Sequence, residues 1–225
     1  DYSAIVEEAT LDSVTQYEVW KAIWSSIHDA NFFELAHALE RHNGFLEHFV
    51  PVTFVGNHDV TRLATAVDDR RHLAHALVVL LTIGGTPTIY YGDEQGYLGL
   101  KEQRVGGDDA IRPEYPGAGP SALADDGWPV YRLHQNLIGL RRRHAWVHSA
   151  RTAPLKLTNE FFAYEVVDSS GDAQRLVVLL NLADDPYEFE VARASTVVAG
   201  DAALTPTAAG VSALTPAHGW AVLEG

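Results

Sequence analysis

Three consecutive polar residues, Asn57, His58 and Asp59, are the first candidates for chemistry in this chain. They directly follow residues 51–56, a short segment rich in β-branched and aromatic side chains, as is typical of a buried parallel strand. Reacting groups in parallel α/β folds lie just past the carboxyl ends of strands. A single Asp in such a place is more often an N-cap, here for a turn beginning at Val60. Three polar groups in a row favour a functional site instead.

A second polar cluster follows a second segment with strand character. Residues 86–91 are expected to form a buried strand, and Asp93 and Glu94 follow it after a glycine. Between the two strands, residues 69–83 have the apolar spacing of a helix, which two consecutive glycines end. Strand, helix and strand at this spacing predict a βαβ unit, with both polar clusters at strand ends.

Apolar residues at helical spacing also occur on both sides of this unit. They predict three helices, over residues 17–26, 31–41 and 128–143. Asp29 is expected to cap the second of these helices, and a further parallel strand is expected near residues 11–15. Residues 93–128 are rich in Gly, Pro and Asp and form a loop far longer than an ordinary connection, which usually indicates function.

The chain changes character after residue 150. The rest of it has β-branched runs separated by turn residues and few helix signals. Residues 192–217, rich in Ala and Thr, are expected to be loosely packed. We therefore predict two domains, an α/β domain over residues 1–150 and a small all-β domain over residues 151–225. The strands of the second domain are expected over residues 161–167, 175–182, 187–191 and 219–223.

Charge and composition exclude several classes of function. The 225 residues include 16 Lys and Arg against 30 Asp and Glu, a formal charge of −14 that repels nucleic acid and anionic membranes. The longest apolar stretch, residues 74–83, has half of the ~20 residues that a membrane span needs. The chain has no cysteine, which removes disulfides and thiolate chemistry. We expect no nucleic-acid or membrane partner. The sequence does not decide the cellular compartment, with the cytoplasm slightly favoured.

Longer strings of residues resemble one enzyme family. Residues 54–59 (FVGNHD) resemble the strand-seven signature of the α-amylase family of glycoside hydrolases, and residues 85–94 (GTPTIYYGDE) resemble its eighth strand. Residues 17–20 are similar to the segment after strand six, and residues 106–113 to the long loop after strand eight. Residues 151–225 resemble the family's C-terminal β domain. The resemblance implies the C-terminal portion of a (β/α)₈ TIM barrel, about strands six to eight, followed by a small antiparallel β-sandwich domain.

The resemblance also implies roles for single residues. Asp59 matches the third catalytic carboxylate, which favours the oxocarbenium-like state of a reaction with retention. Asn57 and His58 match substrate-binding positions. Arg62 is grouped with them, and its side chain would either pair with Asp59 or lie on a helix surface. Possible loop contacts to substrate are Asp93, Asp108 and Arg112.

The nucleophile and the general acid of the family have no counterpart in this sequence. Retaining hydrolysis needs two carboxylates about 5–5.5 Å apart, and the family's Gly-x-Arg-x-Asp string is not present. A whole barrel takes ~250 residues, whereas 150 precede the predicted β domain. Because the chain also has no Met, we expect it to begin inside a longer product and to be inactive alone. Its open sheet edges would pair with the missing N-terminal barrel half or with a second copy of the chain.

No cofactor and no metal are expected. His72 and His75 lie three positions apart in the predicted helix, but such pairs are usually ordinary histidines. Asp108 and Asp109 could bind calcium or shape a loop together with the preceding glycines, and we favour the loop.

Three functions remain open from the sequence. The leading hypothesis is a part of a retaining α-glycosidase that acts on α-glucans or maltooligosaccharides. A transglycosidase or isomerase of the same family would use the same groups and differ in whether water or a sugar hydroxyl reaches the covalent intermediate. A noncatalytic carbohydrate-binding or assembly protein is the alternative that the missing carboxylates favour for this chain taken alone.

Overall fold

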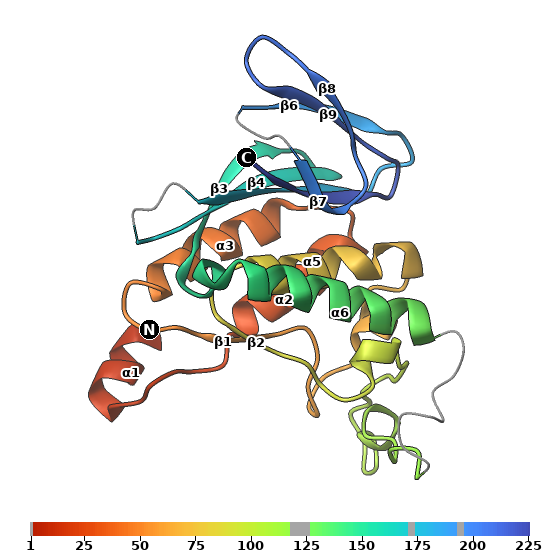
Figure 1. Cartoon of the computed structure of the whole chain (residues 1–225). Coiled ribbons are helices and arrows are strands. Elements are labelled where there is room, and N and C mark those ends of the chain that lie inside the picture. Colours follow the sequence, from red (N-terminus) through yellow and green to blue (C-terminus); the bar gives the residue numbers. More distant parts are fainter. Residues whose placement is uncertain (1, 118–126, 171–173, 193–195) are drawn as a thin grey trace.

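The computed structural model describes residues 2–117, 127–170, 174–192 and 196–225, with helices mainly in the first part and strands mainly in the last (Figure 1). The helices are α1 (Tyr2–Ala9), α2 (Tyr17–His28), α3 (Phe33–Phe45), α4 (Leu63–Ala66), α5 (Leu73–Thr82) and α6 (Trp128–Arg143). The strands are β1 (Val52–Phe54), β2 (Thr86–Thr88), β3 (Arg151–Leu157), β4 (Phe161–Val167), β5 (Arg175–Asn181), β6 (Tyr187–Val191), β7 (Thr196–Gly200), β8 (Ala203–Pro206), β9 (Val211–Thr215) and β10 (Trp220–Glu224). Short 3₁₀ turns include η1 (Arg70–His72), η2 (Asp93–Gln95), η3 (Asp109–Ile111) and η6 (Ala145–Ser149).

β1 and β2 form the expected parallel pair, with Val52 opposite Thr86. The strand expected near residues 11–15 is reduced to a single parallel bridge from Thr15 to Val52. The expected burial of the second strand is wrong, because Thr86 and Thr88 are exposed. Within the described residues β2 pairs with β1 on one edge only, so its side chains lack the cover that a central strand has.

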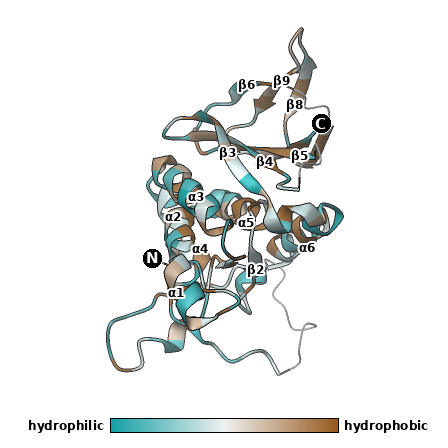
Figure 2. Cartoon of the chain, turned by 90° about the vertical axis from the view of Figure 1, so that its left-hand side faces the viewer, coloured by the Kyte–Doolittle hydropathy of each residue, from teal (hydrophilic) through white to brown (hydrophobic). Residues whose placement is uncertain are grey.

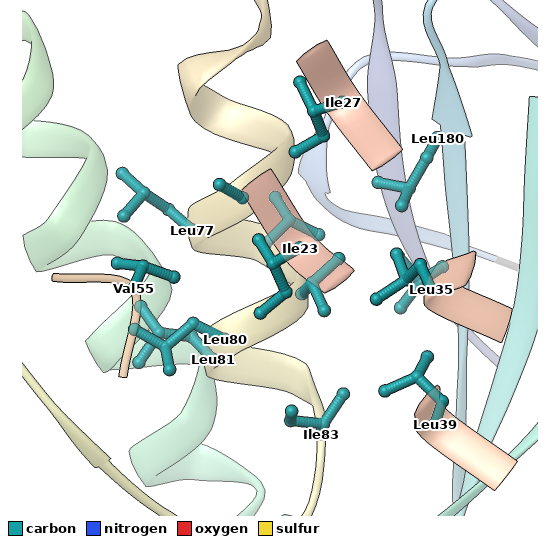
Figure 3. Close-up of a cluster of buried hydrophobic side chains, with 14 of the residues drawn as sticks. Ile23, Ile27, Leu35, Leu39, Val55, Leu77, Leu80, Leu81, Ile83 and Leu180 are labelled. Atoms are coloured by element: carbon teal, nitrogen blue, oxygen red, sulfur yellow. The ribbon is translucent and has the colours of Figure 1, made fainter. Parts of the chain in front are cut away.

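α5 lies at the centre of the helical part. Its sequence is apolar almost all around, which is typical of a helix buried on every side, and each of its residues except Ala74 is buried. The residues around it belong to one core cluster that joins helices and sheet. Figure 3 shows side chains of this cluster, among them Ile23 and Ile27 of α2, Leu35 and Leu39 of α3, Leu77, Leu80 and Leu81 of α5, and Leu180 of β5.

Arg141 of α6 fixes this helix to the end of α5. Its guanidinium donates to three backbone carbonyl oxygens, those of Leu81, Ile83 and Gly85. The last carbonyls of a helix have no partner inside the helix, so Arg141 supplies a partner for Leu81 in the last turn of α5 and for two carbonyls just beyond the helix. Burial lowers the pKa of Arg141 to about 10, and the side chain stays charged at neutral pH.

The last part of the chain forms two antiparallel sheets. The larger has the strand order β3-β4-β5-β10-β7 and the smaller the order β6-β9-β8. Alternate residues of β4 face opposite sides: Phe162 and Tyr164 join the core around α5, whereas Phe161 and Ala163 join a second core shared with the smaller sheet. Figure 2 shows the resulting layers, with helices on one face of the larger sheet and the smaller sheet beyond the other.

Two expectations about this region and the helices are corrected. Residues 192–217 are not loosely packed, because their described part holds β7, β8 and β9, and Ala213 is fully buried. Pairing of β7 with β10 and of β9 with β6 holds this segment in the two sheets. Asp29 ends α2 instead of capping the next helix. The amide oxygen of Asn31 accepts from the N–H of Phe33 at the start of α3.

The helices and the sheets share contacts across residue 150. The buried hydroxyls of Thr82 and Tyr164 are 2.7 Å apart, and the main core cluster draws residues from both parts. The division into domains 1–150 and 151–225 therefore stays a prediction. None of the helices in the described part of the chain has both the length and the apolar character to cross a membrane.

Candidate functional site

Asn57, His58 and Asp59 lie in the turn directly after β1. The amide of Asn57 shapes this turn: its oxygen accepts from the N–H of Asp59 at 2.8 Å, and its nitrogen donates to the hydroxyl of Tyr17 at 3.1 Å. The side chains of His58 and Asp59 are 64% and 51% exposed, and His58 Nε2 is 3.3 Å from Asp59 Oδ2. The first helix after the turn begins only at Leu63, so Asp59 presents its carboxylate to solvent and does not cap a helix.

Arg112 of the long loop contacts this turn. Its Nη2 is 3.0 Å from Asp59 Oδ1 and 2.7 Å from Asp108 Oδ2, and its Nε donates to the backbone oxygen of His58 at 2.7 Å. Lys101 binds the other oxygen of Asp108 at 2.8 Å. The hydrogen bond from Lys101, together with the charge of Arg112, lowers the pKa of Asp108. The structure thus brings Asp59, Asp108 and Arg112 together, as a network of alternating charges.

Both expectations for Arg62 are wrong. Its side chain is fully buried and contacts Asp93 at 3.0 Å, not Asp59. The same Nη1 atom donates to the backbone oxygen of Tyr91 at 2.6 Å, and the guanidinium lies 4.2 Å above the ring of Tyr90. A side chain with no exposed surface cannot reach a substrate, so Arg62 is not a substrate-binding residue.

Asp93 is also buried, with 2% of its side chain exposed. Burial raises the pKa of Asp93 to about 6, and the hydrogen bond from Arg62 acts in the opposite direction. Gly56 allows the carboxylate to approach β1, because a Cβ at this position would be 2.0 Å from Asp93 Oδ2. Asp93 therefore joins the two strand ends and is not placed to contact a substrate.

A hollow of about 450 Å³ adjoins Asp59 between α2 and the loops that follow β1 and β2. Its lining includes the indole side chains of Trp20 and Trp24 and the polar side chains of Thr61, Thr65, Lys101 and Gln103. The two tryptophans are neighbours of the site that were not predicted from the sequence. Their i, i+4 spacing on one helix face was the available signal. A larger hollow of about 770 Å³ is lined by α1, α2 and α3 residues, and none of the three residues of the turn lines it.

The two histidines of α5 and η1 are engaged in hydrogen bonds. His75 Nε2 lies 3.0 Å from the backbone oxygens of both Asn181 and Gly219 and therefore carries the proton. His72 Nε2 is 2.9 Å from His218 Nδ1. In residues 2–117, 127–170, 174–192 and 196–225, no three His, Asp or Glu side chains are grouped so that they could hold a metal ion.

The geometry of the site can be compared with known proteins. Residues 7–115, which include β1, β2 and the turn with Asp59, match the model of the α-amylase catalytic domain. This part of the chain belongs to the α-amylase family. The cyclomaltodextrin glucanotransferase of Bacillus sp. strain 38-2 is 34% identical over 114 residues, which are 51% of this chain and 14% of that protein. The enzyme of the same name from Bacillus licheniformis is 32% identical over 114 residues, with the same coverage.

Solved structures give the same fold for the whole chain. An α-amylase from H. orenii superposes with a TM-score of 0.81 at 18% identity, covering 100% of this chain and 51% of that one. A debranching enzyme from Nostoc punctiforme gives a TM-score of 0.72 at 19% identity, covering 95% and 48%. The chain thus spans about half of these structures and one seventh of the curated relatives. Its fold is part of a (β/α)₈ barrel followed by antiparallel sheets, as the sequence predicts.

Proposed function

We propose that the chain forms the C-terminal part of a retaining α-glycosidase that acts on α-glucans or maltooligosaccharides. The observation that carries this proposal is the position of Asp59. It follows β1 within the family match, exposes its carboxylate beside a hollow lined by two tryptophans, and is held by Arg112. A carboxylate fixed in this way can stabilise the positive charge that develops on a sugar ring during glycosidic cleavage.

In this proposal the neighbours of Asp59 have distinct roles. His58, exposed beside it, hydrogen-bonds substrate hydroxyls. Asn57 is half-buried, so it orients the turn and offers only its remaining exposed surface to substrate. Arg112 and Asp108 contact substrate from the loop or position Asp59. Trp20 and Trp24 offer apolar faces of the kind on which sugar rings stack.

The proposal includes the inactivity of the chain by itself. Retaining cleavage needs a nucleophile and an acid about 5–5.5 Å apart, and we assign neither role to a residue of this chain. The pair would come from barrel units that precede the present sequence in a complete enzyme. We expect no hydrolysis of maltooligosaccharides by the chain above the rate in buffer, together with calorimetric binding of maltoheptaose that Asp59→Asn weakens only slightly.

The decisive experiment substitutes Asp59 in the complete enzyme. Asp59→Asn should lower kcat by about 10² to 10³, roughly 3–4 kcal/mol, with a small change in KM, because the charge acts mainly at the transition state. His58→Ala should have a milder effect, since its hydrogen bonds exist in both states. Asp109 is an exposed residue of the long loop that contains Asp108 and Arg112, and Asp109→Asn is the control that should leave kcat unchanged. A small effect of Asp59→Asn on KM alone would overturn the role of Asp59.

Transglycosylation is the second candidate, because the curated relatives described above are named glucanotransferases. Product analysis separates the two reactions. Hydrolysis releases one new reducing end for each bond broken, whereas transfer gives longer or cyclic glucans without a net gain of reducing ends. A complete protein that binds glucan and produces neither product would favour the noncatalytic carbohydrate-binding function.

A further inference from the structure

Arg62 connects two segments that are far apart in the sequence. It follows β1, whereas its partners Tyr91 and Asp93 follow β2, and one Nη1 atom contacts both of them, at 2.6 and 3.0 Å. The guanidinium also lies within 6 Å of three tyrosine rings, those of Tyr90, Tyr91 and Tyr97. The ends of both strands are therefore held on one buried side chain.

Backbone hydrogen bonds extend this connection. The N–H of Arg62 donates to the oxygen of Gly99 at 2.9 Å. The N–H of Gly99 donates to the hydroxyl of Thr65 at 2.9 Å, and the N–H of Lys101 donates to the hydroxyl of Thr61 at 3.1 Å. Residues 61–65 and 99–101 are thus joined on both sides of Arg62. Asp59 stands two residues before this joined segment.

The buried ion pair between Arg62 and Asp93 is a poor source of stability. Among the residues that the structure describes, Arg62 Nε, Arg62 Nη2 and Asp93 Oδ2 are buried and find no hydrogen-bond partner. Buried ion pairs of this kind can often be replaced by apolar residues of similar size with no loss of stability, whereas removal of one partner is strongly destabilising. An apolar pair cannot replace the directional hydrogen bonds of Arg62, because a planar guanidinium fixes the positions of the atoms that it binds.

We propose that Arg62 and Asp93 are positioning residues, which fix the loop after β1 against the loop after β2 and thereby fix the place of Asp59. This inference rests on the proposed function of Asp59. Neither residue touches the substrate, and both act through the backbone segments that they hold.

The test separates position from stability in the 225-residue chain. In the double variant Arg62→Met/Asp93→Leu both charges are removed together, and Leu keeps the branched shape of Asp. We expect global stability in urea close to that of the original chain. Amide hydrogen exchange at positions 62, 99 and 101 should become at least tenfold faster, with exchange inside α5 unchanged. Maltoheptaose affinity, measured by calorimetry, should fall no more than it does for Asp59→Asn, because Asp59 acts mainly at the transition state.

Two further variants complete the design. Arg62→Lys keeps the charge and loses the planar fork, so it should also accelerate exchange at the same three amides, and it keeps the test open if the double variant does not fold. Arg41→Met/Glu18→Leu removes an exposed ion pair between α2 and α3 and should leave these amides unchanged.

Unchanged exchange at the three amides, or a uniform increase that includes α5, would overturn the positioning role. The exchange result does not depend on glucan binding. If the original chain binds no maltoheptaose, the proposed function loses support, while exchange still decides whether Arg62 and Asp93 position the loops.

Discussion

His75 makes the stability of the chain depend on pH. It lies on α5 without exposed surface and donates from Nε2 to the backbone oxygens of Asn181 and Gly219, which lie at the ends of the strands of the larger sheet. Burial, followed by the charge of His72, lowers the pKa of His75 from 6.5 to about 4. The folded chain therefore holds a neutral imidazole at a pH at which the unfolded chain holds a protonated one.

The sign and size of the effect follow from proton linkage. Because the pKa is lower in the folded state, the stability due to neutral His75 is complete above pH 6.5 and is lost as the pH falls from 6.5 to 4. One pKa unit corresponds to about 1.4 kcal/mol, so the free energy of unfolding should fall by about 3 kcal/mol across this interval. The pKa of His72 is lowered as well, mainly by burial, and acts in the same direction.

The assay is urea unfolding at pH 7.5 and pH 4.5 of the original chain, of His75→Gln and of His37→Gln. An amide at position 75 can still donate to a carbonyl and does not titrate, so His75→Gln should lose about 2 kcal/mol less on acidification than the original chain. His37 is exposed on α3, and its variant should follow the original chain. Equal losses for His75→Gln and the original chain would refute the assignment of the pH effect to His75.

Two other predictions concern side chains that join segments. Arg141→Met should lower the free energy of unfolding by about 2–3 kcal/mol, because three backbone carbonyls at the end of α5 lose a charged donor, whereas the exposed Arg142→Met should have little effect in the same urea titration. Gly56→Ala should destabilise the chain by about 1–3 kcal/mol, because the new Cβ would displace the carboxylate of Asp93. Gly44→Ala, in a helix and with no atom of the described residues within 4 Å of the added Cβ, should stabilise the chain by up to about 1 kcal/mol. The opposite order of the two glycine variants would contradict this account.

Elements with strong local signals could be predicted from the sequence. The apolar pattern of α5 and α6 and the β-branched residues of β1 and β4 each agree with the environment in which they lie, so local preference and burial point the same way. The turn with Asp59 was predictable for the same reason. It directly follows a recognisable strand, and the position of a strand end in a parallel sheet is fixed by the fold.

Features that depend on distant partners could not be predicted. The strand β8 has a single β-branched residue, Thr205, and it forms because β9 pairs with it, while β7 and β9 pair in turn with β10 and β6. The partner of Arg62 lies 31 positions further along the chain. The sequence leaves the nearby Asp59 or a helix surface open for Arg62, since it does not show that Gly56 leaves room for Asp93 beside the end of β1.

The two arginines of the site differ in a way that fits the chemistry proposed for it. Arg62 is buried and holds Asp93 where solvent does not screen the pair. Arg112 is 42% exposed and divides one nitrogen between Asp59 and Asp108, while Lys101 binds Asp108 as well. Exposed ion pairs contribute little free energy to stability, so Arg112 can orient the Asp59 carboxylate without neutralising its charge permanently. A carboxylate that must meet a developing positive charge needs this combination: a fixed place and a charge that remains available.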